Sequence, residues 1–225
     1  AFNNNWNCST GSIQRFDNAS CWSKGAVPVA YDNVVFNGTG SDDCNVTNNT
    51  MPQYLNSFTV GDYGGSIYFE SLFAVGDWTG SNTGTQEWNV TGDINVSNGT
   101  VYVYGDYPYN ISAEGAGQVW RSVSGNVTIG SNAVVDGVGL GFAGGGIGPG
   151  GSTGGACHGG YDGNAAAPNG AESALSTPYG NASAPTSLGS SGEIVGYCTG
   201  GSAVKLQSDA GVMIVDGVIN MSAAS

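Results

Sequence analysis

Short runs that alternate apolar and small polar residues recur along this 225-residue chain, and they limit its fold more than any other feature. Successive side chains of a strand point to opposite faces, so such runs predict strands with one buried face. A sustained helical spacing of apolar residues is missing, and Gly, Asn, Thr and Val are abundant. We therefore expect an all-β protein. Its predicted strands are residues 33–36, 44–47, 57–60, 66–69, 88–97, 100–104, 118–122, 126–129, 133–136, 203–207 and 212–220.

Three segments repeat the same order of a short strand, a polar turn and a second short strand. They are residues 94–105, 127–137 and 204–217, with turns at 97–99, 130–132 and 208–211. Units of this size cannot bury a face alone and must stack on one another. The repeat favours a β-solenoid, and a β-sandwich is the alternative because short alternating strands also suit it.

Asn-x-Ser/Thr triplets, the acceptor motif for N-glycosylation, are unusually dense. There are twelve, none with Pro in the middle, about three times the number that composition alone gives. This density predicts a secreted glycoprotein. The predicted glycosylation sites are Asn7, Asn18, Asn37, Asn45, Asn48, Asn89, Asn95, Asn98, Asn110, Asn126, Asn181 and Asn220.

Half of these triplets have a larger apolar residue at the centre. On a strand the Asn and the hydroxyl residue then share one face, and the central residue points to the other. The pattern predicts a wall with sugars outside and an apolar inside, although half-exposed strands rich in Val and Thr also generate such triplets. The six central residues are Val46, Val90, Val96, Ile111, Val127 and Met221.

Charge is sparse and acidic, with 4 Lys and Arg against 17 Asp and Glu and a net charge of −13. So few cations cannot neutralise the phosphates of a nucleic acid, so nucleic-acid binding is not expected. The chain has no apolar run of about 18 residues, so no membrane insertion is expected. It opens with Ala1 rather than Met, which we interpret as a processed chain or a fragment. The expected location is extracellular, at the cell surface.

Five cysteines accompany the glycosylation motifs, which makes disulfides plausible. Cys157 and Cys198 bracket the glycine-rich stretch and form the favoured pair. The pairing of Cys8, Cys21 and Cys44 stays open, and one of them is left over, either free or bonded to a neighbouring chain. Zinc is not expected, because there is no Cys-x-x-Cys and only one His.

The glycine-rich part of the chain carries several blocks in a specific order. Gly148-Pro149-Gly150 is followed by Gly155-Ala156-Cys157-His158-Gly159-Gly160. A block from Tyr179 to Gly192 and a strand pair from Gly200 to Ile219 complete the order. Over residues 123–223 the chain resembles the glycine-rich β-helix module of large eukaryotic extracellular and cell-surface proteins. Cys157 and Ser191 stand where that module has Gly. Residues 22–36 are similar to the first coil of β-helical, adhesin-like surface proteins.

The resemblance implies a right-handed parallel β-helix with a glycine-rich excursion and an extracellular structural role. It supplies no catalytic site. We expect one domain over residues 1–225, with N-terminal coils at 1–122 and the glycine-rich module at 123–225. Glycine permits close approach of backbones, so the excursion can pack tightly. A flexible linker is the plainer interpretation of the same composition.

Catalytic and metal chemistry has little support in the sequence. His158 is the only imidazole, and no Gly-x-Ser-x-Gly motif accompanies it. Asp42 and Asp43 faintly resemble the carboxylates of β-helical pectin hydrolases, but adjacent residues of a strand point to opposite faces. The 162–164 segment, Asp-Gly-Asn, fits a polar turn better than a calcium loop. We expect no enzyme activity and no cofactor; a glycoside hydrolase or polysaccharide lyase is the residual alternative.

Tyrosines alternate after residue 99, at Tyr102, Tyr104, Tyr107 and Tyr109. Outward aromatics of this kind either contact sugars or cover the wall under glycans.

The leading hypothesis is a structural subunit of a surface fibre, filament or sheath that joins copies of itself head to tail, because the open ends of a parallel stack leave backbone groups unpaired. The alternative is a carbohydrate-binding adhesin. Contacts between copies must avoid glycans on the twelve Asn-x-Ser/Thr triplets, or sequons. The expected joining surfaces are therefore the ends of the stack and residues 129–180.

Overall fold

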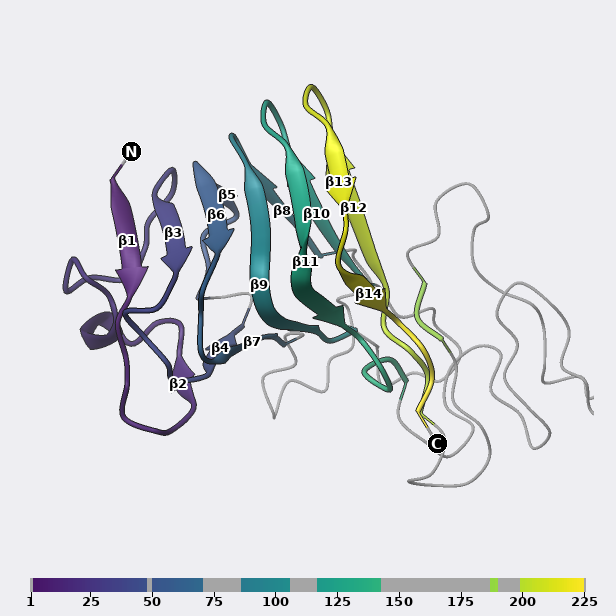
Figure 1. Cartoon of the computed structure of the whole chain (residues 1–225), viewed down its shortest axis with the longest axis horizontal. Helices are drawn as coiled ribbons and strands as arrows, with labels where there is room; N and C mark the ends of the chain where they lie inside the picture. The colour runs from purple at the N-terminus through teal and green to yellow at the C-terminus, as the bar shows by residue number, and fades with distance from the viewer. Residues whose placement is uncertain are drawn as a thin grey trace, which may run out of the picture.

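The computed structural model describes residues 2–47, 50–70, 86–105, 117–142, 187–189 and 199–224, and within them the protein is all-β apart from the short 3-10 helix η1 (Ala19–Cys21). Figure 1 shows strands stacked side by side along the long axis of the protein, from β1 near the N-terminus to β13 and β14 near the C-terminus. The strands are β1 (Asn3–Trp6), β2 (Gln14–Arg15), β3 (Asn33–Phe36), β4 (Cys44–Val46), β5 (Tyr54–Leu55), β6 (Ser57–Val60), β7 (Ser66–Phe69), β8 (Gln86–Val90), β9 (Ile94–Val103), β10 (Gln118–Ser122), β11 (Val127–Asp136), β12 (Val204–Ser208), β13 (Met213–Val215) and β14 (Val218–Asn220).

Every pairing between these strands is parallel. A parallel neighbour requires a long connection rather than a hairpin, and Asn3, for example, pairs with Asn33 and Ile94 with Val127. The β-sandwich alternative is wrong for the described strands, because its sheets are antiparallel.

The strands stack in three columns. Column A holds β1, β3, β6, the first half of β9, the first half of β11 and β13. Column B holds β2, β4, β7, the second halves of β9 and β11, and β14. Column C is the separate sheet of β5, β8, β10 and β12. Along the chain, a column C strand is followed by one of column A and then one of column B, and we call one such passage a coil.

The turns expected inside two of the repeats are bends within single strands. β9 runs through Gly99, which has φ +98, and β11 runs through residues 130–132 with a register shift. A bend rather than a hairpin forms there because each half pairs in parallel with the same strand of the neighbouring coil. The strand boundaries predicted at these two places were therefore wrong, because each place lies within one continuous strand.

The third repeat is out of register with the other two. β12 belongs to column C and pairs with β10, so Ser208 lies beside Ser122. The segment 208–211 therefore occupies the corner between columns C and A, where 123–126 lies one coil earlier. The bend equivalent to residues 97–99 is Asp216-Gly217, between β13 and β14. The three repeats are thus similar in sequence, but the third occupies a different position in the coil from the first two.

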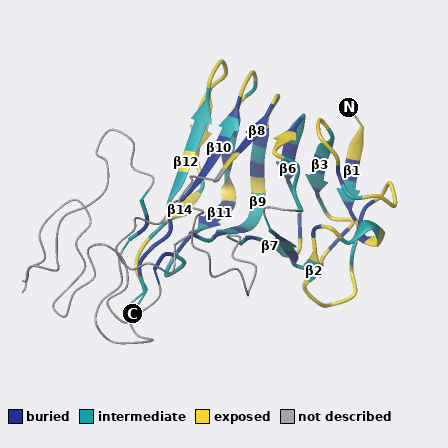
Figure 2. Ribbon diagram, turned by 180° about the vertical axis from the view of Figure 1, so that it is seen from behind, coloured by how far each residue is buried: buried dark blue, intermediate teal, exposed yellow. Residues whose placement is uncertain are grey.

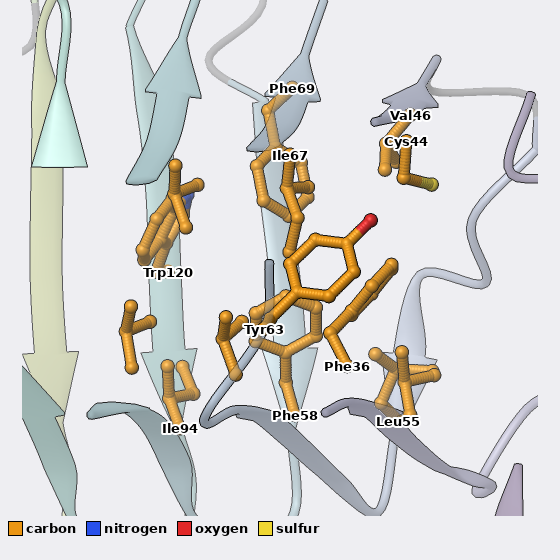
Figure 3. Packing of buried hydrophobic residues seen from close by; sticks show 14 of the residues in the cluster. Phe36, Cys44, Val46, Leu55, Phe58, Tyr63, Ile67, Phe69, Ile94 and Trp120 are labelled. Atoms are coloured by element: carbon orange, nitrogen blue, oxygen red, sulfur yellow. The ribbon is translucent and has the colours of Figure 1, made fainter. Parts of the chain in front are cut away.

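Rows of apolar side chains, one residue from each coil, fill the space between the columns. One row of column A is Val34, Phe58, Ile94 and Val127, all fully buried. Column C adds Trp88 and Trp120, whose ring centroids lie 5.3 Å apart. Figure 3 shows Phe36, Phe58, Tyr63 and Phe69 converging with Ile94 and Trp120 in one core. Each such side chain contributes about 1.5–3 kcal/mol on burial, so the stack is held mainly by this core.

Polar residues at the corner between columns C and A connect successive coils. Ser122 Oγ donates to the Gly92 carbonyl at 2.7 Å, and Ser208 Oγ donates to the Gly125 carbonyl at 2.9 Å. Both serines also accept the backbone N–H of the glycine three residues on, at 3.1 Å. The corner therefore satisfies backbone groups that would otherwise be unpaired where the chain leaves one sheet for the other.

Residues 16–26 cover the N-terminal end of the stack. The Trp22 ring packs against Trp6, Phe16 and Phe36, with centroid distances of 4.8–5.7 Å. A disulfide joins Cys8 to Cys21. The Asn7 N–H donates to the Cys21 carbonyl, and the Ser23 N–H donates to the Asn5 carbonyl. Residues 21–23 therefore occupy the outer edge of β1. We call residues 2–32 the N-terminal cap.

Candidate functional site: the sequon-bearing outer faces

Nine of the twelve predicted glycosylation sites lie among the described residues, and Asn48, Asn110 and Asn181 lie outside them. Asn45, Asn89, Asn95, Asn98 and Asn220 are on strands, and Asn126 immediately precedes β11. Asn7, Asn18 and Asn37 lie in turns or caps. The described sequons are therefore spread over all three columns and both ends of the stack, so sequons also lie at the ends that we expected to be joining surfaces.

The apolar centres of the strand triplets point inward, as expected from strand geometry. Val46, Val90, Val96 and Val127 are at most 2% exposed. Met221 packs at the edge of the core, and Ile111 lies outside the described residues. The prediction that the central residues of the triplets face the apolar interior is confirmed at these four positions.

Three triplets, two outside the strands and one at the end of β14, share one local geometry. The hydroxyl of the +2 residue donates to the Asn side-chain carbonyl at 2.7 Å for Ser20 and Asn18, 2.6 Å for Thr39 and Asn37, and 2.7 Å for Ser222 and Asn220. The +2 backbone N–H donates to the same oxygen in each case. This is the turn that Asn side chains form with their own backbone, and it commits Oδ1 while leaving the amide nitrogen out of that interaction.

Asn45 and Asn95 have a buried side-chain oxygen without a hydrogen-bond partner in the described structure. Both residues lie on outward-facing rows, Asn45 beside Tyr68 in column B and Asn95 between Thr59 and Thr128 in column A. A buried polar atom that stays unpaired costs about 1–3 kcal/mol, so each needs an explanation.

Asn89 differs from the other described sequons because the residue is buried, at only 9% exposed. Burial at this level opposes the attachment of a sugar to its amide nitrogen. We predict that Asn89 stays unmodified while the exposed Asn126 and Asn220 carry glycans. Glycopeptide mass spectrometry after enzymatic removal of the sugars in heavy-oxygen water measures this directly. Occupancy of Asn89 equal to that of Asn126 in correctly folded protein would show that the outer face of β8 is open.

Two tyrosines stack on the outer face of column B. The ring centroids of Tyr68 and Tyr102 are 4.8 Å apart, and the two ring planes are nearly parallel, at 7°. Val101 and Val103 are fully buried on the other face, as the alternation of Tyr and Val predicted. The Tyr68 hydroxyl lies 3.4 Å from the Asp43 carboxylate, and burial together with that charge raises the pKa of Tyr68. Tyr107 and Tyr109 lie outside the described residues.

Asp42 and Asp43, the faint candidates for a catalytic pair, bind the backbone instead. The Asp42 carboxylate accepts from Thr10 N, Thr10 Oγ1 and Gly11 N, all at 2.7 Å. Burial opposes its ionisation, but these donors outweigh it and lower the pKa of Asp42. Asp43 accepts the Ser66 N–H at 2.8 Å. The two carboxylates thus anchor the cap loop and the start of β7, and sequence alone did not indicate these loop contacts.

The cysteines divide into a disulfide and a buried thiol. Cys8 pairs with Cys21, which settles part of the pairing that the sequence left open. Cys44 is a free, fully buried thiol. If Cys157 and Cys198 pair as predicted, Cys44 is the odd cysteine, and its burial argues against a bond to a neighbouring chain. Cys157 and Cys198 themselves lie outside the described residues, as do His158 and residues 162–164.

Burial, and after it the nearby Asp43, raises the pKa of Cys44 well above its ordinary value. Because the thiolate is the reactive form, we expect Cys44 in the native protein to resist alkylation by iodoacetamide at pH 8. Unfolding in guanidinium should expose it and restore ordinary reactivity. Mass spectrometry of the peptide that contains Cys44 checks this, and rapid native alkylation would contradict the burial.

No group of His, Cys, Asp and Glu side chains that fits a metal ion occurs in the part of the chain that the structure describes. None of its described helices is long and apolar enough to cross a bilayer. Comparisons with models of protein families, with curated proteins and with solved structures gave no match. The function is therefore inferred from the residues and their geometry alone.

Proposed function

We propose that this chain is an N-glycosylated, extracellular structural protein that folds as a right-handed parallel β-helix and serves as a subunit of a surface fibre or sheath. The all-parallel columns and the repeated passage from column C to A to B support the β-helix. Crossovers between parallel strands are right-handed in about 98% of cases, which supports the handedness.

The observation that carries this proposal is the division between the two faces of the strands. Sequon asparagines stand on the outer rows of β4 and β9, and their neighbours Val46 and Val96 are buried in the core. The unpaired oxygens of Asn45 and Asn95 are consistent with attached sugars, because a glycan on the adjacent nitrogen brings donors within reach. The Cys8–Cys21 disulfide is compatible with an oxidising, extracellular compartment.

Sedimentation of the glycosylated chain tests the structural role. Secreted from a eukaryotic host and purified at micromolar concentration, the protein should sediment as a series of multiples of its mass, with larger species at higher concentration. Electron microscopy of the same sample should show elongated particles. A single monomeric species at every concentration would reject the fibre subunit.

The stacked pair Tyr68 and Tyr102 favours a second function, carbohydrate binding by the outer face of column B. Aromatic rings with polar neighbours provide a platform for sugars, and Asp43 and Asn45 lie beside this pair. Binding to a glycan array that disappears in Tyr68→Ala and in Tyr104→Ala would support it. The plain alternative is that the pair only stabilises two adjacent strands, in which case both variants lose stability and no binding is seen in the parent protein.

A further inference from the structure

The two ends of the described stack are built differently. At the C-terminal end, Met213, Val215 and Ile219 continue the inward rows of Val127, Ile129 and Val135. The earlier three are fully buried, whereas the last three are 47%, 44% and 38% exposed. The coil of β12 to β14 covers the first set, whereas no further coil among the described residues covers the second. The last coil therefore leaves an apolar end surface and the strand edges of β12, β13 and β14 without a described neighbour (Figures 1 and 2).

At the N-terminal end, the same inward rows are closed within the chain. The row of Met213 and Val127 ends in Asn4, a buried polar residue that donates to the Ala26 carbonyl at 2.9 Å and accepts the Lys24 N–H at 3.2 Å. Residues 21–23 occupy the outer edge of β1. A strand of another molecule therefore cannot extend column A beyond β1 as a further coil does elsewhere.

Exposed apolar side chains nevertheless gather at both ends. Among the described residues, the exposed large hydrophobic side chains of the cap are Phe2, Ile13, Val29 and Tyr31, and those of the last coil are Val212, Met213, Ile214, Val215, Val218 and Ile219. Of the described residues between these two groups, only Tyr54 and Val123 are exposed large hydrophobic residues. Exposed apolar side chains that are concentrated in two parts of a protein, rather than scattered singly, point to interfaces there.

Charge favours contact between the two ends over contact between the side walls. The whole chain has a net charge of −13, which repels copies of itself. The cap is neutral, because Arg15 and Lys24 form ion pairs of 2.8 Å with Asp17 and Asp32. The last coil, residues 203–224, carries only Lys205, Asp209 and Asp216, and Asp209 pairs with Arg121. The ends are therefore the parts of this acidic protein that repel one another least.

We infer that the last coil of one copy seats on the N-terminal cap of the next, in a head-to-tail contact of apolar side chains that does not continue the strands of column A. This inference rests on the proposed fibre subunit and specifies its junction. The contact is heterologous, since two different surfaces of the chain meet, and repetition of such a contact gives an open filament. Asn220 points outward beside Asp136, away from the junction, whereas Asn7 and Asn18 in the cap must be free of glycan in the assembled form.

Two double variants test the junction. Met213→Asp with Ile219→Asp disables the C-terminal surface, and Phe2→Asp with Ile13→Asp disables the cap surface. Each variant alone should sediment as a monomer, because a buried carboxylate opposes the contact. An equimolar mixture should form a one-to-one heterodimer and nothing larger, because one intact surface of each kind remains. Val123→Asp, at a 42% exposed position between the ends, is the matched control and should assemble like the parent.

The outcomes separate this junction from its alternatives. A parent protein that never assembles rejects the proposed function itself. If the parent assembles but the cap variant alone forms dimers, the C-terminal surfaces pair with one another and the head-to-tail junction is wrong. A mixture that stays monomeric, while circular dichroism shows both variants folded, also rejects the junction. Heterodimer in the mixture alone supports it and shows that both variants have folded.

Discussion

Trp120→Ala is expected to lower the free energy of unfolding by about 3–5 kcal/mol, the largest effect of any single substitution that we consider. The Trp120 ring is fully buried and packs on Trp88 and Phe69, with centroids 5.3 Å and 5.5 Å away. Its Nε1 donates to Gln118 Oε1 at 3.1 Å. Removing the ring leaves a cavity between columns and takes a partner from a buried amide.

Because Trp120 holds the Gln118 side chain, its removal also weakens the hydrogen bonds that Gln118 makes to another column. Its Nε2 donates to the carbonyls of Phe69 and Tyr104, so the same side chain ties column C to column B. Guanidinium unfolding followed by circular dichroism measures the effect. Val123→Ala, in the exposed corner next to β10, is the control and should change stability by less than about 0.5 kcal/mol. Equal stability of the two variants would mean that Trp120 is not in the core.

Gly125→Ala is expected to cost about 1–3 kcal/mol, because it forces a side chain between stacked coils. A Cβ at this position would lie 2.6 Å from the Asp93 backbone nitrogen and against the Gly92 carbonyl carbon. Both contacts are backbone atoms of the preceding coil, which cannot move without widening the spacing of about 4.8 Å between strands. The next glycine along the corner, Gly211, is placed against Gly125 in the same way.

Gly64→Ala is the matched control for this prediction. Its Cβ would meet Ser41 at 3.6 Å, an ordinary contact. The midpoint of thermal unfolding should fall for Gly125→Ala and stay near the parent value for Gly64→Ala. A Gly125→Ala protein as stable as the Gly64→Ala protein would contradict the close stacking of coils at this corner.

Much of the secondary structure could be predicted from the sequence, because strand alternation is a local property. The strands at residues 33–36, 57–60, 66–69 and 118–122 match the structure, and so does the inward direction of Val101 and Val103. The third repeat was assigned to the wrong position because its sequence suits two positions in a coil. Only the pairing of β12 with β10 distinguishes these two positions.

The features that sequence did not reveal depend on contacts between distant residues. The inward row ends in the polar residue Asn4, whose side chain is hydrogen-bonded to the backbone of residues 24 and 26. The structural use of Asp42 depends on a loop more than thirty residues earlier in the chain. Likewise, the sequon at Asn89 is indistinguishable from its neighbours in sequence, and only the folded protein shows it to be buried. Tyr68 was missed as the partner of Tyr102 because parallel register, not spacing, brings them together.

A cryo-EM map of the glycosylated, secreted protein at a resolution that separates strands tests the central claim most directly. We predict parallel strands about 4.8 Å apart, sugar density on the outer faces of columns A and B at Asn95 and Asn45, and end-to-end contacts between copies. Antiparallel strands, outer faces bare of sugar, or copies joined through those faces would contradict it.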